Sequence, residues 1–123
     1  MIEYTVKVFE DKTEWYLNGN LHREDGPAVE CIDGEKEWWV NGKRHRVGGP
    51  AVEWAEGSKF WYLNNQRHRE DGPAIERANG RKEWYLNDKL VSEADFNKRT
   101  KTKELTVNEI EKILGYKIKV VGE

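Results

Sequence analysis

The chain has 123 residues, of which 36% are charged and 37% hydrophobic, and a formal net charge of −2 at pH 7. Such polarity is common in disordered chains, but six Trp, five Tyr and three Phe argue for a fold, because each aromatic side chain buries roughly 150–250 Å². No apolar run approaches the roughly 18 residues of a membrane span, and 21 basic against 23 acidic residues exclude a strong positive field for duplex nucleic acid. We expect one small domain with a thin core.

The first residues and the cysteine content indicate a cytoplasmic protein. Residues 1–10 are acidic and alternate between apolar and polar side chains, which is not the pattern of a signal peptide. The single cysteine, Cys31, excludes an internal disulfide and a cysteine metal cluster, and no cation next to it favours a reactive thiolate. The alternation from Tyr4 to Phe9 predicts an opening strand.

An internal repeat organises the chain after this strand. Trp15, Trp38, Trp61 and Trp84 are spaced 23 residues apart. The first copy reads WYLNGNLHREDGPAVE and the third reads WYLNNQRHREDGPAIE, identical at 12 of 16 positions. A unit of this length holds two short strands and cannot bury its own apolar face, so successive units must stack.

Turn signals divide each copy into short strands. Asn-Gly pairs predict two-residue hairpins because both positions tolerate positive φ, and Asn-Asn and Asn-Asp are weaker forms of the same signal. These pairs stand at Asn18-Gly19, Asn41-Gly42, Asn64-Asn65 and Asn87-Asp88. A proline such as Pro50 opens the next strand, where it needs no donor for the ladder. Further hairpins close at Asp33-Gly34, Glu56-Gly57 and Asn79-Gly80.

The stacked copies predict a mainly β fold, an antiparallel meander of repeated β-hairpins. We expect its core to be a ladder of the four repeat tryptophans with Leu17, Val40, Leu63 and Leu86, joined by Val29, Val52 and Ile75. A second aromatic row consists of Tyr16, Trp39, Tyr62 and Tyr85, and strand alternation places it on the opposite face. Either this row binds a partner or the C-terminal helices cover it as a second core.

Helix signals follow where the repeat stops. Ser92 and Asp95 form a short capping pattern for a helix from Glu93 to Arg99. Thr106 with Glu109 forms a capping box, Leu105 with Ile110 a hydrophobic staple, and Gly115 is the expected C-cap; the stripe between them comprises Val107, Ile110, Ile113 and Leu114. Lys117 to Val120 alternates as a final strand. We expect a single domain, 1–123, with a repeat sheet over 4–91 and a helix-helix-strand cap over 92–123.

The 23-residue period resembles the MORN repeat, which carries an aromatic strand, an Asn-Gly turn and then a histidine. Trp38, Asn41-Gly42 and His45 match that order. Arg46 stands where the family has a second glycine after the histidine, so the chain resembles a divergent form, of the kind found in tailed bacteriophages. The resemblance covers roughly residues 4–121. It implies one hairpin per unit and a sheet used as an interaction surface, and in a phage-encoded chain it implies a location in the host cytoplasm.

A His-Arg pair recurs once in each of three copies, at His22-Arg23, His45-Arg46 and His68-Arg69. The pairs could present a row of cations to an anionic ligand, or each histidine could pack on its neighbour while each arginine pairs with the adjacent Glu-Asp. The structural interpretation is favoured because a repeat keeps what its own stacking needs. The second copy differs: Val47-Gly48 replaces Glu-Asp, which leaves Lys43, Arg44 and Arg46 as a basic spot without local counter-charges.

The same patterns speak against catalysis. Three histidines 23 residues apart form a line, whereas a tetrahedral metal site needs ligands that converge. Catalytic sets are normally unique, and the His, Glu and Asp residues here are repeated. The chain contains no phosphate-binding loop, no Gly-x-Ser-x-Gly and no dinucleotide fingerprint. We therefore expect no enzyme activity, no metal and no cofactor.

Three functions remain open at this point. The preferred one is a non-catalytic protein-binding module that occludes a host protein, such as a defence protein, through its aromatic row and its His-Arg side chains. The second is sequestration of a small anionic nucleotide by the His-Arg pairs and aromatics. The third is a purely structural module that forms a homo-oligomer through its open sheet edges.

Overall fold

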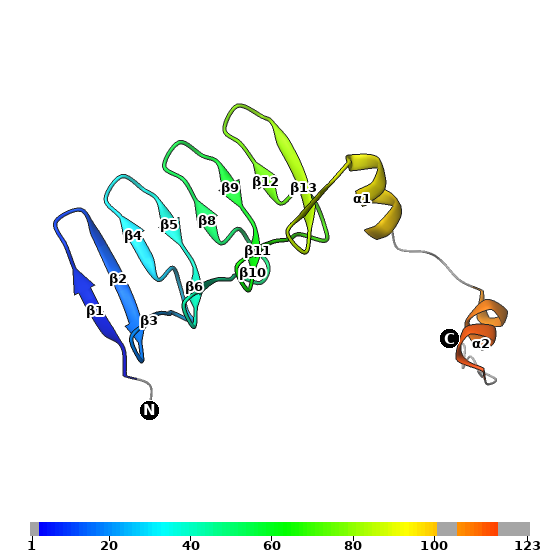
Figure 1. The fold of residues 1–123 in the computed structure, drawn as a ribbon, viewed down its shortest axis with the longest axis horizontal. Helices are drawn as coiled ribbons and strands as arrows, with labels where there is room; N and C mark the ends of the chain where they lie inside the picture. Colours follow the sequence, from blue (N-terminus) through cyan, green and yellow to red (C-terminus); the bar gives the residue numbers. More distant parts are fainter. Residues whose placement is uncertain (1–2, 101–105, 116–123) are drawn as a thin grey trace, which may run out of the picture.

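The computed structural model describes residues 3–100 and 106–115. The fold is mainly β, with antiparallel hairpins that follow one another along an extended sheet and short helices after it (Figure 1), so the expected fold class is confirmed. The first strands are β1 (Thr5–Val8), β2 (Lys12–Leu17), β3 (Asn20–Leu21), β4 (Val29–Cys31), β5 (Lys36–Glu37), β6 (Trp39–Val40) and β7 (Lys43–Arg44). They are followed by β8 (Val52–Glu53), β9 (Lys59–Phe60), β10 (Tyr62–Leu63), β11 (Gln66–Arg67), β12 (Ile75–Glu76), β13 (Lys82–Leu86) and β14 (Lys89–Val91).

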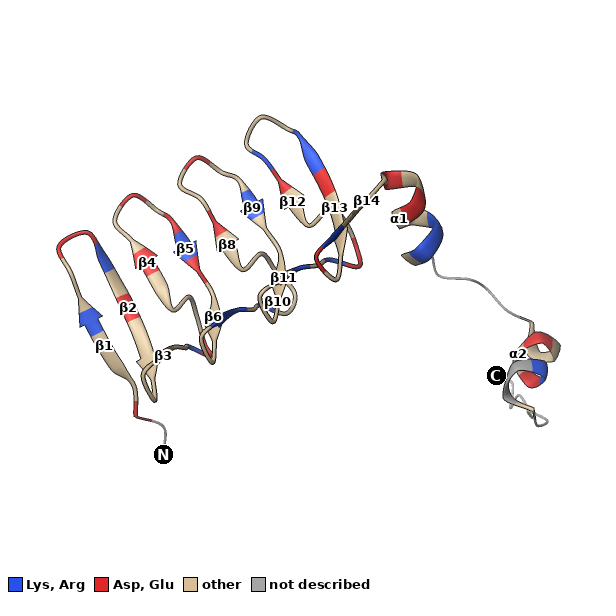
Figure 2. Cartoon of the chain, in the orientation of Figure 1, with Lys and Arg blue, Asp and Glu red and all other residues tan. Residues whose placement is uncertain are grey.

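The main sheet has the strand order β1-β2-β4-β5-β8-β9-β12-β13-β14, and β3 pairs with β2 beside this path. We refer to residues 15–37, 38–60 and 61–83 as units 1, 2 and 3, and to the chain from residue 84 as unit 4. β4, β8 and β12 each carry a glutamate, and they alternate with β5, β9 and β13, which each begin with a lysine (Figure 2). Glu53 lies opposite Lys36 on one side and Lys59 on the other. Opposite charges on facing positions support this register.

Two-residue turns form a second row of hairpins below the main sheet. Both central residues of each turn have positive φ, as the Asn-Gly signal predicts, with 51° and 75° at Asn41 and Gly42. The weaker Asn64-Asn65 and Asn87-Asp88 signals produce the same conformation. Each small hairpin bonds to the next: the backbone N–H of Asn65 donates to the carbonyl of Arg44 at 2.8 Å, and that of Asp88 donates to Arg67 at 2.9 Å.

The buried centre of the sheet differs from the expected ladder. The fully buried residues are small: Ala28, Ala51 and Ala74 are 0% exposed, and each accepts a 2.7 Å hydrogen bond from the backbone of a repeat tryptophan. Val29, Val52 and Ile75 are also buried, as expected. Val29 lies opposite Glu14 and Glu37, which places its side chain on the face of the sheet opposite to the Trp15 ring. The four tryptophan indoles are only half-buried. The small alanine side chains allow neighbouring strands to pack closely, and the indoles cover the face of the sheet on which they lie.

The helix signals are confirmed where the chain is described. Helix α1 (Glu93–Thr100) begins with Ser92 Oγ accepting a hydrogen bond from the backbone of Asp95, at 3.1 Å. Helix α2 (Val107–Leu114) has the capping box of Thr106 and Glu109, and it ends at Gly115 with a φ of 78°. The expected final strand from Lys117 to Val120 lies outside the described residues, as does Leu105 of the expected staple.

Helix α1 packs at the end of the sheet, against β13, with the Phe96 side chain buried. Among the four residues of the second aromatic row, only Tyr85 is buried, at 8% exposed, and the other three are half-buried. Neither helix in the described part of the chain is long and apolar enough to cross a membrane.

Candidate functional site

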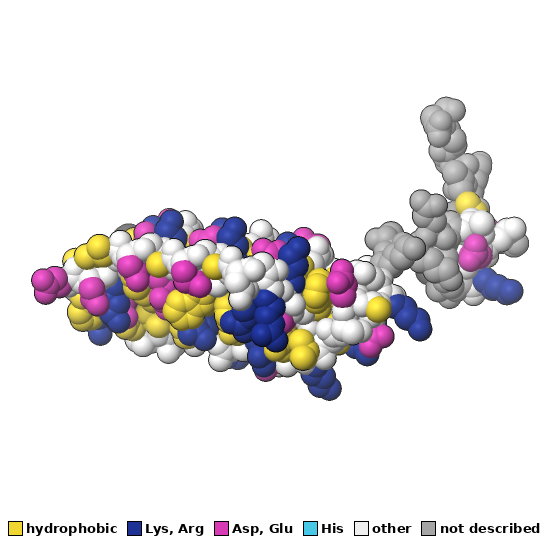
Figure 3. All heavy atoms as spheres, turned by 90° about the horizontal axis from the view of Figure 1, so that it is seen from above, with side chains coloured by type: hydrophobic (Ala, Val, Ile, Leu, Met, Phe, Trp, Pro, Cys, Tyr) yellow, Lys and Arg dark blue, Asp and Glu magenta, His cyan; other side chains and the backbone are white. Residues whose placement is uncertain are grey.

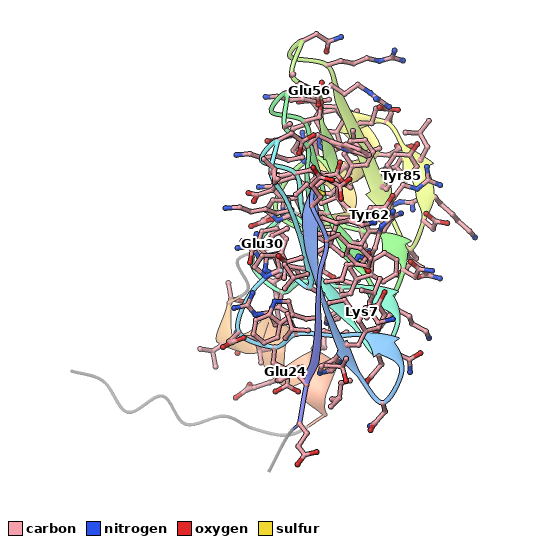
Figure 4. The ribbon with its side chains drawn as sticks, turned by 90° about the vertical axis from the view of Figure 1, so that its left-hand side faces the viewer. Lys7, Glu24, Glu30, Glu56, Tyr62 and Tyr85 are labelled. Atoms are coloured by element: carbon pink, nitrogen blue, oxygen red, sulfur yellow. The ribbon has the colours of Figure 1, made fainter. Side chains whose placement is uncertain are left out.

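The repeated side chains lie on two opposite faces of the sheet. Seen along the molecule, Tyr62 and Tyr85 lie on the same side as Lys7, whereas Glu24 and Glu30 lie on the other (Figure 4). We call the first side the Tyr face, defined by Tyr16, Trp39, Tyr62 and Tyr85. The other side is the Trp face, defined by the four repeat tryptophans with the three His-Arg pairs. The predicted site residues are therefore divided between the two faces.

On the Trp face, Arg23 is held by four partners in its own unit. Its Cζ lies 3.9 Å from the centroid of the Trp15 ring. Its Nη1 donates to the carbonyl of Pro27 at 3.2 Å and to Glu30 at 3.0 Å, and its Nε donates to Asp25 at 3.0 Å. Stacking on indole and charge-assisted hydrogen bonds together fix the guanidinium in one place.

Unit 3 repeats this arrangement closely. Arg69 lies 3.9 Å from the Trp61 centroid, and it donates to Pro73, Glu76 and Asp71 at 3.1, 3.1 and 2.9 Å. The fold therefore brings Arg23 and Arg69 into internal contacts, each with its charge opposed by two carboxylates of the same chain.

Each histidine links its own unit to the next. The Nδ1 of His22, His45 and His68 accepts a hydrogen bond from the backbone N–H of Asn41, Asn64 and Asn87, at 2.9, 3.0 and 2.9 Å. An Nδ1 that accepts carries no proton, so the proton of the neutral ring is on Nε2. In units 1 and 3 that Nε2 lies 3.4 Å from Glu24 and 3.3 Å from Glu70.

Unit 2 lacks these acidic partners. Arg46 still stacks at 3.8 Å on Trp38 and donates from Nη1 to the carbonyl of Pro50 at 3.0 Å. Val47 and Gly48 stand where units 1 and 3 have Glu and Asp. Within residues 3–100 and 106–115, neither His45 nor Arg46 forms an ion pair. Of the basic spot that the sequence indicated at Lys43, Arg44 and Arg46, Arg46 therefore lies beside His45, and neither has an ion pair in this part of the chain.

Hollows of similar lining lie on the Trp face between successive units. The first, of about 610 Å³, lies between the loop 23–26 and unit 2, where Trp38, Val40 and Arg46 line it. The second, of about 340 Å³, lies between the loop 46–50 and unit 3. At the corresponding place in unit 4, the end of α1 contributes Arg99 and Thr100 to a hollow with Leu86.

The Tyr face carries cations stacked over its aromatic row. Lys7 lies 4.5 Å from the Tyr16 centroid and Arg67 lies 4.3 Å from that of Tyr85. Arg44 is shared between Trp39, at 5.2 Å, and Tyr62, at 5.6 Å. Of the predicted basic spot, Arg44 therefore belongs to the Tyr face and lies apart from Arg46, which stacks on Trp38.

The neighbouring carboxyl groups of Glu35 and Glu37 on this face were not predicted as site residues from the sequence. Burial, the hydrogen bond to Glu37 and that residue's charge raise the pKa of Glu35 to about 7. Arg44 Nη2 lies 3.5 Å from Glu37, while its Nε is buried without a hydrogen-bond partner among the described residues. The alternation Glu35-x-Glu37 at the end of a strand was the available signal, since it places both carboxyls on one face. Nearby, burial raises the pKa of the Cys31 thiol.

Comparisons with known proteins add no relative: no protein-family profile, curated protein or solved structure matched the chain. Among the described residues, no three His, Cys, Asp or Glu side chains are grouped so that they could hold a metal ion. A functional assignment therefore depends on the geometry of the two faces.

Proposed function

We propose that this protein is a non-catalytic binding module that occludes a surface of another protein with its Tyr face. The observation that carries this proposal is the row of Tyr16, Trp39 and Tyr62, which is half-exposed and interleaved with Lys7 and Arg44. Neighbouring strands lie about 4.8 Å apart, and each unit contributes two strands, so one aromatic side chain recurs about every 10 Å along the face. The row thus offers a regular contact surface on a hydrogen-bonded sheet.

The chemistry of this row suits protein recognition. Tyr, Trp and Arg are the residues most enriched at energetic hot spots of interfaces, because they bury large areas at a low entropy cost. The Tyr16 hydroxyl donates to Glu14 at 2.8 Å and Trp39 Nε1 donates to Glu37 at 3.1 Å, so the rings are already oriented. Seen from above, apolar side chains are mixed with acidic and basic ones along the sheet (Figure 3).

Nucleotide sequestration by all three His-Arg pairs is the weaker proposal. An anion bound to Arg23 or Arg69 would have to displace internal carboxylates that already contact each guanidinium. The resemblance to phage repeats adds that the occluded protein belongs to the host. That part of the proposal concerns the target's identity and is separable from the choice of face.

The test is capture of a binding protein from lysate of the host cell by immobilised chain. Loss of capture is expected for Tyr62→Ala and for Arg44→Gln, because both remove side chains of the Tyr face. The matched control is Val47→Ala, which changes an exposed side chain on the other face. Circular dichroism verifies that each variant is folded. Unchanged capture by both Tyr-face variants, or loss with the control, would contradict the proposal.

A further inference from the structure

We propose that His45 and Arg46 form a binding site for a carboxylate side chain of a partner peptide. The site goes beyond the proposed Tyr-face function, because it lies on the Trp face and involves none of the same residues. Its basis is a comparison inside the chain. The two neighbouring units fill the corresponding place with their own acidic side chains, and unit 2 leaves it open.

The donors of this site are already oriented. His45 Nδ1 is occupied by the backbone N–H of Asn64, so Nε2 carries the proton and is free to donate. The stack on Trp38 and the bond to Pro50 hold the Arg46 guanidinium in the same pose as Arg23 and Arg69. In units 1 and 3 the corresponding Nε2 and Nε contact a glutamate and an aspartate. A carboxylate from outside finds two donors that need no rearrangement.

The surrounding charges favour an anion of low charge. Glu24-Asp25 lines one hollow together with His45 and Arg46, and Glu70-Asp71 lines the next hollow together with Arg46. The two aspartates are 82% and 87% exposed. Glu53 is the acidic residue of unit 2 that corresponds to Glu30 and Glu76. A nucleotide with several phosphate charges would be repelled by these groups, whereas a single carboxylate fits between them.

The spacing and charges of the neighbouring units also indicate which residues flank the carboxylate in the partner peptide. Successive units are two strands apart, about 9.6 Å, and a polyproline II helix repeats every three residues over about 9.3 Å. A peptide in that conformation with an acidic residue at the centre would place basic residues three positions away opposite the two acidic pairs. The hollow lined by Trp38 and Val40 offers an apolar surface for the prolines between them.

The first experiment uses sodium acetate and detects imidazole nitrogens by ¹⁵N nuclear magnetic resonance at constant ionic strength. Acetate is expected to shift the Nε2 signal of His45 and to leave those of His22 and His68 unchanged, since Glu24 and Glu70 occupy the latter. Inorganic phosphate serves as the second probe. Equal shifts at all three histidines, no shift at His45, or a response to phosphate alone would overturn the carboxylate site.

The second experiment measures fluorescence anisotropy with the labelled peptide Gly-Lys-Pro-Pro-Asp-Pro-Pro-Lys-Gly. Replacing its Asp by Asn is expected to weaken binding about tenfold, because a charge-assisted pair is lost. The protein variant V47E/G48D brings the Glu-Asp pair of units 1 and 3 into unit 2, so it is expected to exclude the peptide. Because Gly48 has a φ of 82°, which disfavours Asp, circular dichroism verifies that this variant is folded, and Val47→Glu, which keeps Gly48, is the second excluding variant. Val47→Ala is the matched control and keeps binding.

The result that would overturn the proposal is absence of peptide binding to the wild-type chain or equal binding to V47E/G48D. The Tyr-face variants Tyr62→Ala and Arg44→Gln are expected to bind this peptide normally. Failure of the carboxylate site thus leaves the Tyr-face proposal standing, and failure of the Tyr-face proposal leaves this one standing.

Discussion

Asn41 donates its backbone N–H to the Nδ1 of His22, which lies 19 residues earlier in the chain and 2.9 Å away. The same bond joins units 2 and 3 and units 3 and 4. This hydrogen bond links each small hairpin to the loop of the preceding unit. The His22 side chain that accepts it is buried, at 3% exposed. His22 is therefore a connector between repeats.

Replacing His22 by Ala is expected to lower the free energy of unfolding by about 2 kcal/mol, because a buried ring and a hydrogen-bond acceptor are lost together. His22→Asn is expected to cost less, since its side-chain oxygen can accept the same N–H. Urea denaturation measures both. An equal cost for the two variants would show that the bond to Asn41 contributes nothing.

Arg69 is expected to stabilise the fold more than Arg46. Both stack on a tryptophan and bond to a proline carbonyl, but only Arg69 contacts two carboxylates. Arg69→Ala should cost about 2 kcal/mol and Arg46→Ala about 1 kcal/mol. Thermal and urea unfolding of the two variants check this order, and the reverse order would contradict the role assigned to unit 2.

Gly72 leaves room for the Arg69 guanidinium. A Cβ on Gly72 would lie 2.8 Å from the Arg69 Cζ, and the backbone φ of Gly72 does not itself require glycine. Gly72→Ala is expected to cost about 1–2 kcal/mol by pushing the guanidinium off its stack. In an Arg69→Ala background the same substitution should cost little, and a double-mutant cycle measures that difference. Additive costs would argue against the steric explanation.

Glu35 is expected to make the fold less stable as the pH rises. Its pKa is raised from 4.5 to about 7 in the folded chain, so the folded state binds the extra proton and loses stability between about pH 4.5 and pH 7. The largest effect is about 3 kcal/mol, and partial solvation reduces it to about 1–2 kcal/mol. Glu35→Gln should therefore be more stable than wild type at pH 8 and similar at pH 4.

The control for this pH dependence is Glu10→Gln, which alters an exposed carboxyl. Unfolding midpoints in urea from pH 4 to pH 8 give the comparison. If the wild type and Glu35→Gln keep a constant difference across that range, the titration of Glu35 does not account for the stability change.

The strands and turns could be predicted from the sequence because their signals are local. Asn41-Gly42 and the Thr106-Glu109 box each depend on a few adjacent residues, and the structure confirms both. Because the units repeat every 23 residues, the strands and turns predicted for one unit are expected in the others as well. The face on which Val29 lies could not be predicted, because it depends on the pairing register, which Trp15 and Ala28 settle through a bond between distant residues.

The candidate site was harder to predict for the same reason. The sequence placed Lys43, Arg44 and Arg46 in one basic spot, but alternation sends Arg44 to the Tyr face and leaves Arg46 on the Trp face. The absence of Glu and Asp at Val47-Gly48 was visible in the sequence. Only the structure shows that the donors facing this gap are already oriented by Asn64 and Trp38.

The central claim is that the three histidines are equivalent connectors whose Nδ1 accepts from the next unit. Two-dimensional ¹H–¹⁵N spectroscopy of the imidazoles at neutral pH tests it directly, because the two ring nitrogens have different shifts when only one is protonated. All three rings are expected to show a proton on Nε2 and an acceptor Nδ1. A proton on Nδ1 of any of the three would contradict the account.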